Sequence, residues 1–253
     1  MRKLRLLFLL LVLFLTGCTL FILEEDTDAY KALSKQFFDY QTNDISDIKN
    51  FQTFINTVTL DTSIASVKVE VTLYSGLGLL LETRYGSGVI FHVSQTEYHV
   101  MTDYKLTQKE ATQFITIDIH DYLGNTYTAT LKHQDETLGL SGVSFPKGSS
   151  TLKALSIASQ VTFVGEPIML IGYQGRIING LTMGLLESYI LDEQEVLIGF
   201  KTNIPSDDFG NGAVLIDMTH QMIGIQYLYS EGMLYAISYN QLQSFYEIYK
   251  NLS

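Results

Sequence analysis

Two residue types that often carry covalent or metal chemistry are scarce in this chain, which has one cysteine, Cys18, and five histidines. No pair of histidines has the spacing typical of metal ligands. The histidines are His92, His99, His120, His133 and His220. We interpret them as solvated or strand-packing side chains and predict neither a metal site nor a cofactor. Because Cys18 has no second cysteine to pair with, its thiol is free for another modification.

The residues before Cys18 predict that modification. A basic segment, Arg2 to Arg5, precedes an uncharged run from Leu6 to Leu15, as in a secretory signal. The next residues, Leu15-Thr16-Gly17-Cys18, resemble the bacterial lipobox, in which the cysteine accepts diacylglycerol and becomes the mature N-terminus. We therefore predict a lipoprotein signal peptide at residues 1–17 and a chain anchored by lipid on the extracytoplasmic face of the cell membrane.

An uncleaved membrane-spanning helix is the alternative to lipidation. Apolar residues continue to Leu23, so the run approaches the roughly 18 residues that span a bilayer. Two or more acyl chains hold a protein firmly where a single chain holds it only marginally. Both interpretations place the rest of the chain outside the cytoplasmic membrane, with membrane lipid as its predicted partner.

The composition is that of a folded domain with an acidic surface. Hydrophobic residues make up 46% of the chain and charged residues 17%, with no low-complexity tract. The net charge is −11, and removal of the three basic residues of the signal leaves 13 basic against 27 acidic residues, or −14. Such a surface repels phosphate backbones and anionic lipid headgroups, so we exclude nucleic acid as a partner.

The periodicity of apolar residues changes twice along the chain. Helical spacing from Asp28 to Val58 predicts one or two short helices within an anchor, spacer and helical segment at residues 18–58. From Ser66 the period becomes two, as in half-buried strands, and short strands then alternate with turn residues. Helical spacing returns from about Asn240 to Leu252.

The strands form two groups, separated by the connector Pro146-Lys147-Gly148-Ser149-Ser150. Many short strands at close intervals predict an all-β fold. We expect two six-stranded β-barrels at about residues 59–148 and 151–239, preceded by the helical segment and followed by a C-terminal helix at residues 240–252. Periodicity alone leaves a β-sandwich open.

Several segments, in the same order along the chain, resemble HtrA-type trypsin-like serine proteases. Gly86 to Ile90 resembles the family strand G-S-G-[VF]-I, and Val164 to Gly172 resembles V-G-[DE]-x-V-x-A-I-G. Leu181 to Leu185 resembles S-V-T-x-G-I, and Tyr235 to Ile237 fits the family ending F-A-I-P. The resemblance covers nearly all of Ser66 to Leu252, and it implies a trypsin-like domain at residues 59–253.

The same resemblance shows where the catalytic triad would lie, and none of its three residues is present. The family reads T-N-x-H-V around its histidine, and Thr102 to Leu106 place Lys105 at that position. Gly139 stands where the family has its aspartate, and Asn211 stands where it has its serine. Phe209 replaces a glycine whose N–H helps to form the oxyanion hole.

These replacements argue against hydrolysis by the triad mechanism. An amide nitrogen is a poor nucleophile, and in subtilisin the loss of the serine or the histidine alone lowers kcat roughly 10⁶-fold. Recruitment of other residues is an alternative, because a buried lysine can act as a base. Lys105 and Asp135 would then form a dyad, and Ser206 is the nearest hydroxyl in sequence to Asn211.

We interpret the chain as a surface lipoprotein and pseudoprotease whose scaffold serves peptide or protein binding or a structural role. The alternative is an active HtrA-type serine endopeptidase. An extended peptide is predicted to add as a strand beside Gln226-Tyr227-Leu228, because Ile223-Gly224-Ile225 resembles the family strand that leads to the substrate-binding edge. A covering loop at Tyr229 to Gly232 is the alternative at this edge.

Overall fold

The structure is a computed structural model that describes residues 56–60, 62–148, 151–160, 162–175, 177–205 and 209–252. These residues belong to one of two units, Ile55–Ser253, and the other unit, Met1–Phe54, lies outside them. The predicted signal peptide, Cys18 and Ser206 also lie outside the described residues. Among those residues, no helix has the length and apolar character needed to cross a membrane.

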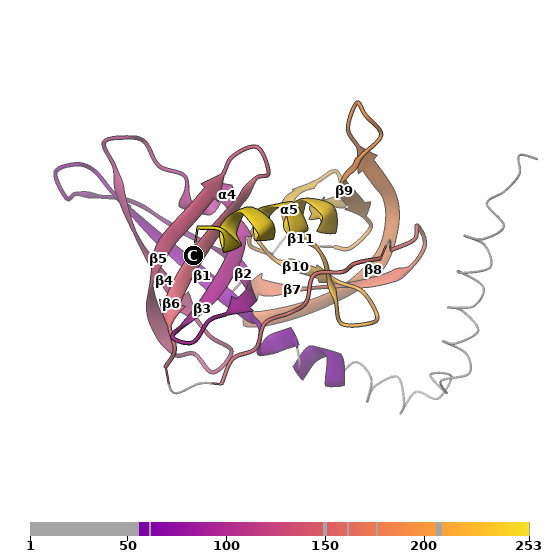
Figure 1. Ribbon diagram of the computed structural model, residues 1–253, viewed down its shortest axis with the longest axis horizontal. Helices are drawn as coiled ribbons and strands as arrows, with labels where there is room; N and C mark the ends of the chain where they lie inside the picture. The colour runs from indigo at the N-terminus through magenta and orange to yellow at the C-terminus, as the bar shows by residue number, and fades with distance from the viewer. Residues whose placement is uncertain are drawn as a thin grey trace, which may run out of the picture. The chain divides into compact units, whose positions relative to one another are not determined.

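The first six strands close into an antiparallel barrel in the order β1-β2-β3-β6-β5-β4 (Figure 1). Residues 56–60 and 62–63 form a short helical segment ahead of it. Val67, Val69 and Val71 alternate along β1 and point into the core of this barrel, as the period of two predicts. The strands are β1 (Ser66–Tyr74), β2 (Leu80–Val93), β3 (Glu97–Asp103), β4 (Phe114–His120), β5 (Thr126–Asp135) and β6 (Leu140–Pro146).

The next six strands close into a second antiparallel barrel in the order β10-β11-β12-β9-β8-β7. Leu170, Phe200 and Leu215 are fully buried in its core. The strands are β7 (Pro167–Gln174), β8 (Ile177–Leu191), β9 (Leu197–Thr202), β10 (Val214–Ile216), β11 (Met222–Ser230) and β12 (Met233–Ser238). The predicted all-β class with two six-stranded barrels is confirmed. It is compatible with a trypsin-like fold and excludes the sandwich.

The C-terminal helix α5 (Tyr239–Lys250) contacts both barrels, and its presence confirms the predicted helix. At its start the Tyr239 ring stacks on Phe200 of the second barrel, with ring centroids 6.3 Å apart. Near its end the Tyr249 hydroxyl lies 2.9 Å from His99 Nδ1 of the first barrel. A Cβ on Gly142 would lie 2.6 Å from Tyr249 Cδ2, so this glycine lets the helix pack closely on β6.

Candidate functional site

The positions aligned with the triad lie on three separate elements. Lys105 is on the short helix α4 (Tyr104–Thr107), Gly139 is in the turn between β5 and β6, and Asn211 is in the loop before β10. The Tyr104 N–H donates to Gly139 O at 3.0 Å, which joins α4 to the turn. A Cβ on Gly139 would lie 3.4 Å from Ile237 Cδ1 of β12. The turn therefore lies between α4 and the second barrel.

Ser87 of β2 connects the two barrels at this junction. Its N–H donates to Asn211 O at 2.8 Å. Its Oγ accepts from the Tyr173 N–H of β7 at 2.8 Å and donates to Gly210 O at 3.2 Å. The side chain is fully buried, so these bonds are shielded from water and their loss would leave buried polar groups without partners. Ser87 therefore holds the loop at residues 209–212 against the first barrel.

The backbones of the two barrels approach each other closely at this junction. A Cβ on Gly86 would lie 2.6 Å from Asn211 O. Gly212 has a φ of +90°, in the left-handed region, and a Cβ on it would overlap Ser87 O. Both the backbone conformation at position 212 and the contact between the barrels therefore require glycine there.

Asp103 is a further buried carboxyl at the same junction, outside the positions aligned with the triad. Its Oδ1 accepts from the Lys105 N–H at 2.8 Å. Burial raises the pKa of Asp103 to about 6, because desolvation outweighs the Lys105 N–H bond, the Lys105 charge and the Asn211 amide, all of which lower it. Oδ2 is buried and has no hydrogen-bond partner among the described residues. We therefore attribute the lowering of the Asp103 pKa by the Asn211 amide to the nearness of that amide and not to a formed hydrogen bond.

The position of Asp103 in the sequence carries a signal that could have identified it. The carboxylate ends β3, whose other residues from Tyr98 to Thr102 are all buried. A charged side chain directly after such a run is expected to be desolvated unless the chain turns outward. The side chain instead accepts a hydrogen bond at the first turn of α4, which keeps it at the barrel junction.

Among the described residues of this junction, no side chains pair a nucleophile with a base. The Lys105 side chain is exposed, and its Nζ lies 6.0 Å from the centroid of the Tyr227 ring, at the limit of a cation–π contact. The neighbouring hydroxyls of Ser87 and Thr102 bond to backbone atoms, since Thr102 Oγ1 donates to Ser87 O. The proposed recruitment of Ser206 concerns a residue outside the described ranges.

Phe209 anchors the loop that the motif resemblance aligns with an oxyanion hole. Its side chain is buried in the core of the second barrel, and its backbone forms an antiparallel bridge with Gln174 of β7. The adjacent Gly210 N–H donates to Tyr173 O at 2.9 Å. The loop is thereby packed onto β7 through a side chain that a glycine would lack.

The predicted peptide-binding segment lies on β11 beside this loop. The Gln226 backbone is already paired, because its N–H donates to Ala213 O at 2.8 Å and its carbonyl accepts from the Gly212 N–H at 2.9 Å. Beyond Gln226, β12 pairs with one side of β11, and no strand in the described part of the chain pairs with the other side. Tyr227 and Leu228 therefore begin an open edge, and Tyr227 contacts Lys105.

The segment considered as a covering loop has a different structure. Tyr229 and Ser230 belong to β11, and Ser230 pairs with Met233 of β12. Glu231 and Gly232, with φ of 54° and 77°, form the two-residue turn between the strands. The turn therefore continues the β11–β12 hairpin.

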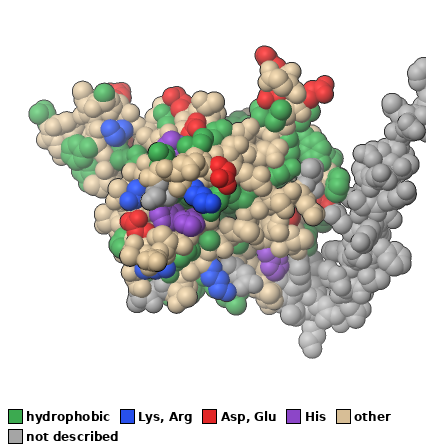
Figure 2. Space-filling model, in the orientation of Figure 1, with side chains coloured by type: hydrophobic (Ala, Val, Ile, Leu, Met, Phe, Trp, Pro, Cys, Tyr) green, Lys and Arg blue, Asp and Glu red, His purple; other side chains and the backbone are tan. Residues whose placement is uncertain are grey.

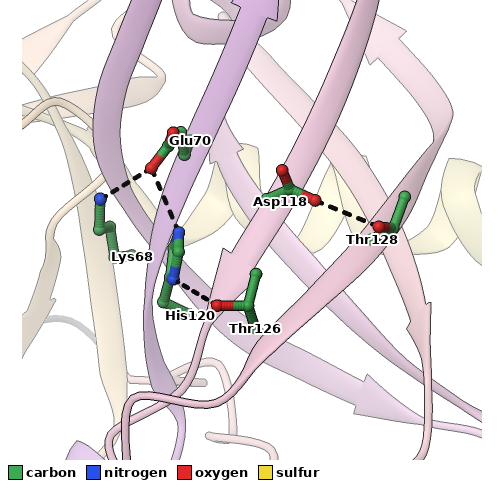
Figure 3. Close-up of polar contacts among 6 residues, drawn as sticks. All are labelled: Lys68, Glu70, Asp118, His120, Thr126 and Thr128. Carbon is green, nitrogen blue, oxygen red and sulfur yellow. Dashed lines mark hydrogen bonds and ion pairs between the residues drawn. The ribbon is translucent and has the colours of Figure 1, made fainter.

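A second polar cluster lies on the outer face of the first barrel (Figure 3). Glu70 Oε2 accepts from Lys68 Nζ at 2.9 Å and lies 3.3 Å from His120 Nε2, while His120 Nδ1 lies 3.0 Å from Thr126 Oγ1. The hydrogen bond from Lys68 lowers the pKa of Glu70. These contacts link neighbouring strands, and we interpret them as structural.

No group of three or more histidine, cysteine or acidic residues within the described ranges is arranged to hold a metal ion. Comparison of the chain with models of known protein families gives no match, and comparison with curated proteins gives none either. The assignment of two barrels therefore depends on the structure alone, and a relation to HtrA-type proteases remains a prediction from the motifs.

Proposed function

We propose that this protein is a membrane-anchored surface lipoprotein, a pseudoprotease related to the HtrA type, that binds an extended peptide or protein segment. The observation that carries the binding role is the open side of β11 from Tyr227 onward. Unpaired N–H and C=O groups on a strand edge can be satisfied by an added strand, and this requires no catalytic triad.

The contacts at the barrel junction support the loss of catalysis. Lys105 occupies the position of the base with an exposed side chain, and Asn211 occupies the position of the nucleophile. The Ser87 hydroxyl serves the contact between barrels, and Phe209 serves the core. These two side chains are thus engaged in structural contacts.

The alternative, an active serine endopeptidase, makes an opposite prediction for covalent labelling. We expect the purified chain to leave unfolded protein substrates intact and to form no adduct with a fluorophosphonate probe, measured by intact mass. An active trypsin-like protease labelled in parallel is the control. A specific adduct on a serine of this chain would contradict the proposal, and peptide mapping of that adduct would identify the nucleophile.

Tyr227→Pro is expected to abolish binding of an extended peptide, because proline removes a backbone N–H from the edge and fixes φ. Peptides selected from a phage-displayed random library with the native chain would serve as ligands, with affinity measured by fluorescence anisotropy.

Tyr227→Ala is the matched control, since it removes the aromatic ring and keeps the backbone donor. Binding through the backbone should survive this change. Equal affinity of a folded Tyr227→Pro variant and the native chain, with folding checked by circular dichroism, would place the peptide on another surface.

A further inference from the structure

The tip of the β1–β2 hairpin exposes an unusual run of leucines. Figure 1 shows the hairpin projecting past the end of the first barrel, and Figure 2 shows hydrophobic side chains at that tip. The chain has no charged residue between Glu70 and Glu82. The exposed fractions are 90% for Leu77, 65% for Leu79, 62% for Leu80 and 50% for Leu81. A cluster of exposed large apolar side chains of this kind indicates an interaction site.

The leucines are exposed on both faces of the hairpin. Leu80 and Leu81 are consecutive residues of β2, so their side chains point to opposite faces of the strand. A flat protein interface would cover one face and leave the other in water. An apolar medium that surrounds the tip covers both, as the boundary between headgroups and acyl chains does.

Four backbone N–H groups of the turn donate to acceptors within the turn itself. The Ser75 N–H donates to Leu79 O at 2.9 Å, and the Gly78 N–H donates to Ser75 O at 2.9 Å. Ser75 Oγ accepts from the Leu77 N–H at 3.3 Å and from the Leu79 N–H at 3.1 Å. Backbone groups must be paired before a segment can leave water for an apolar layer. The hydrogen bonds of Ser75 therefore lower the cost of moving this turn from water into an apolar layer.

Aromatic and then charged residues follow the leucines toward the barrel. Tyr74 and Phe114 stack where β1 ends and β4 begins, with ring centroids 5.2 Å apart. Glu82 and Arg84 form an ion pair at 2.9 Å further along β2. Along the hairpin itself, leucines at the tip are followed by the aromatic pair and then by charges, which is the order found across a membrane interface. Exposed Lys109 and Glu110 belong to the adjoining loop before β4.

We propose that the β1–β2 hairpin inserts its leucine tip into the surface of a lipid bilayer. The inference goes beyond peptide binding, and it relies on the proposed lipid anchor only for a reason why a bilayer is nearby. Since the predicted mature chain has a net charge of −14, the favoured surface is zwitterionic, and insertion depends on apolar contact.

The absence of tryptophan from the chain allows a direct test. Leu77→Trp in the full chain, mixed with an excess of phosphatidylcholine vesicles, is expected to show tryptophan emission at shorter wavelength than in buffer. The emission should be quenched by lipids brominated on their acyl chains and protected from aqueous iodide. Leu79→Ser, Leu80→Ser and Leu81→Ser together, in the Leu77→Trp background, should abolish these effects.

Leu123→Trp is the matched control. Leu123 is 63% exposed in the turn between β4 and β5, at the opposite end of β4 from the hairpin. Its emission should remain accessible to iodide. Equal iodide access for Trp at position 77 with and without vesicles would overturn the proposal. An emission shift at position 77 that depends on the concentration of the protein and is not accompanied by quenching from brominated lipid would instead indicate contact between copies of the chain. That result would also overturn the proposal.

The same samples separate this proposal from the lipid anchor. Intact mass reports the acyl group on Cys18, whereas the Leu77→Trp signal is expected with or without that group because the vesicles are in excess. A chain without acylation and with an inserted hairpin would contradict the anchor alone. An acylated chain with an exposed hairpin would contradict the insertion alone.

Discussion

Gly212→Ala is expected to lower the free energy of unfolding by about 4 kcal/mol or more, which is exceptional for one methyl group. The φ of +90° at Gly212 is unfavourable for alanine. The added Cβ would also overlap Ser87 O and lie 2.7 Å from Thr102 Oγ1. Ser87 cannot yield easily, because its N–H and Oγ hold Asn211, Gly210 and Tyr173. Relief of the overlap therefore requires the barrels to separate.

Gly232→Ala is the matched control for this change. Gly232 has a φ of +77°, and a Cβ on it would meet no atom within 4 Å. Only the backbone conformation is then penalised, at about 1–2 kcal/mol. Urea unfolding of both variants gives the difference, which measures the contact between barrels. Equal losses would show that this contact contributes nothing to stability.

Asp103→Asn is expected to stabilise the protein at pH 7, by up to about 3 kcal/mol. Burial raises the pKa of Asp103 from 3.8 to about 6, and each pKa unit corresponds to about 1.4 kcal/mol. Asparagine keeps an oxygen that can accept the Lys105 N–H and removes the charge that burial penalises. The amide also matches the asparagine of the T-N-x-H-V motif at this position.

The pH dependence of this effect follows from the direction of the pKa shift. A carboxyl with a raised pKa in the folded state contributes stability that is fully present below about pH 3.8 and is lost as pH rises through about 6. The advantage of Asp103→Asn should therefore vanish near pH 4 and be complete near pH 7, as measured by urea unfolding across this range. Asp118→Asn, on the outer face of the first barrel, is the control for the removal of one negative charge. An advantage of Asp103→Asn that does not change with pH would assign the effect to packing.

The sequence predicted the fold well because strand and helix periodicity report burial directly. Val67, Val69 and Val71 repeat every second residue and all point into one core. Leu242, Phe245 and Tyr249 repeat at helical spacing and are all buried beneath α5. Local patterns of this kind depend only on which face of an element meets the core.

The site could be predicted only in part, because its contacts join residues distant in the chain. The motifs pointed to Lys105, Gly139 and Asn211, yet the buried carboxyl of Asp103 and the role of Ser87 between barrels were not evident. Gln226 was expected on the open edge, but its backbone groups are paired with Ala213 and Gly212. Such pairings depend on where one strand ends relative to another.

The sequence by itself determined the alternation of buried and exposed residues and the two groups of strands, and its motifs predict the replacement of each triad residue. Only the tertiary structure decided which polar groups share the junction, where β11 loses its partner and that the leucines of the β1–β2 hairpin extend past the barrel. A short apolar run such as Leu79 to Leu81 does not by itself show whether it is buried or exposed. The physical reason is that periodicity records one element at a time, whereas closure of a barrel sets which distant backbones meet and which hairpin is left outside.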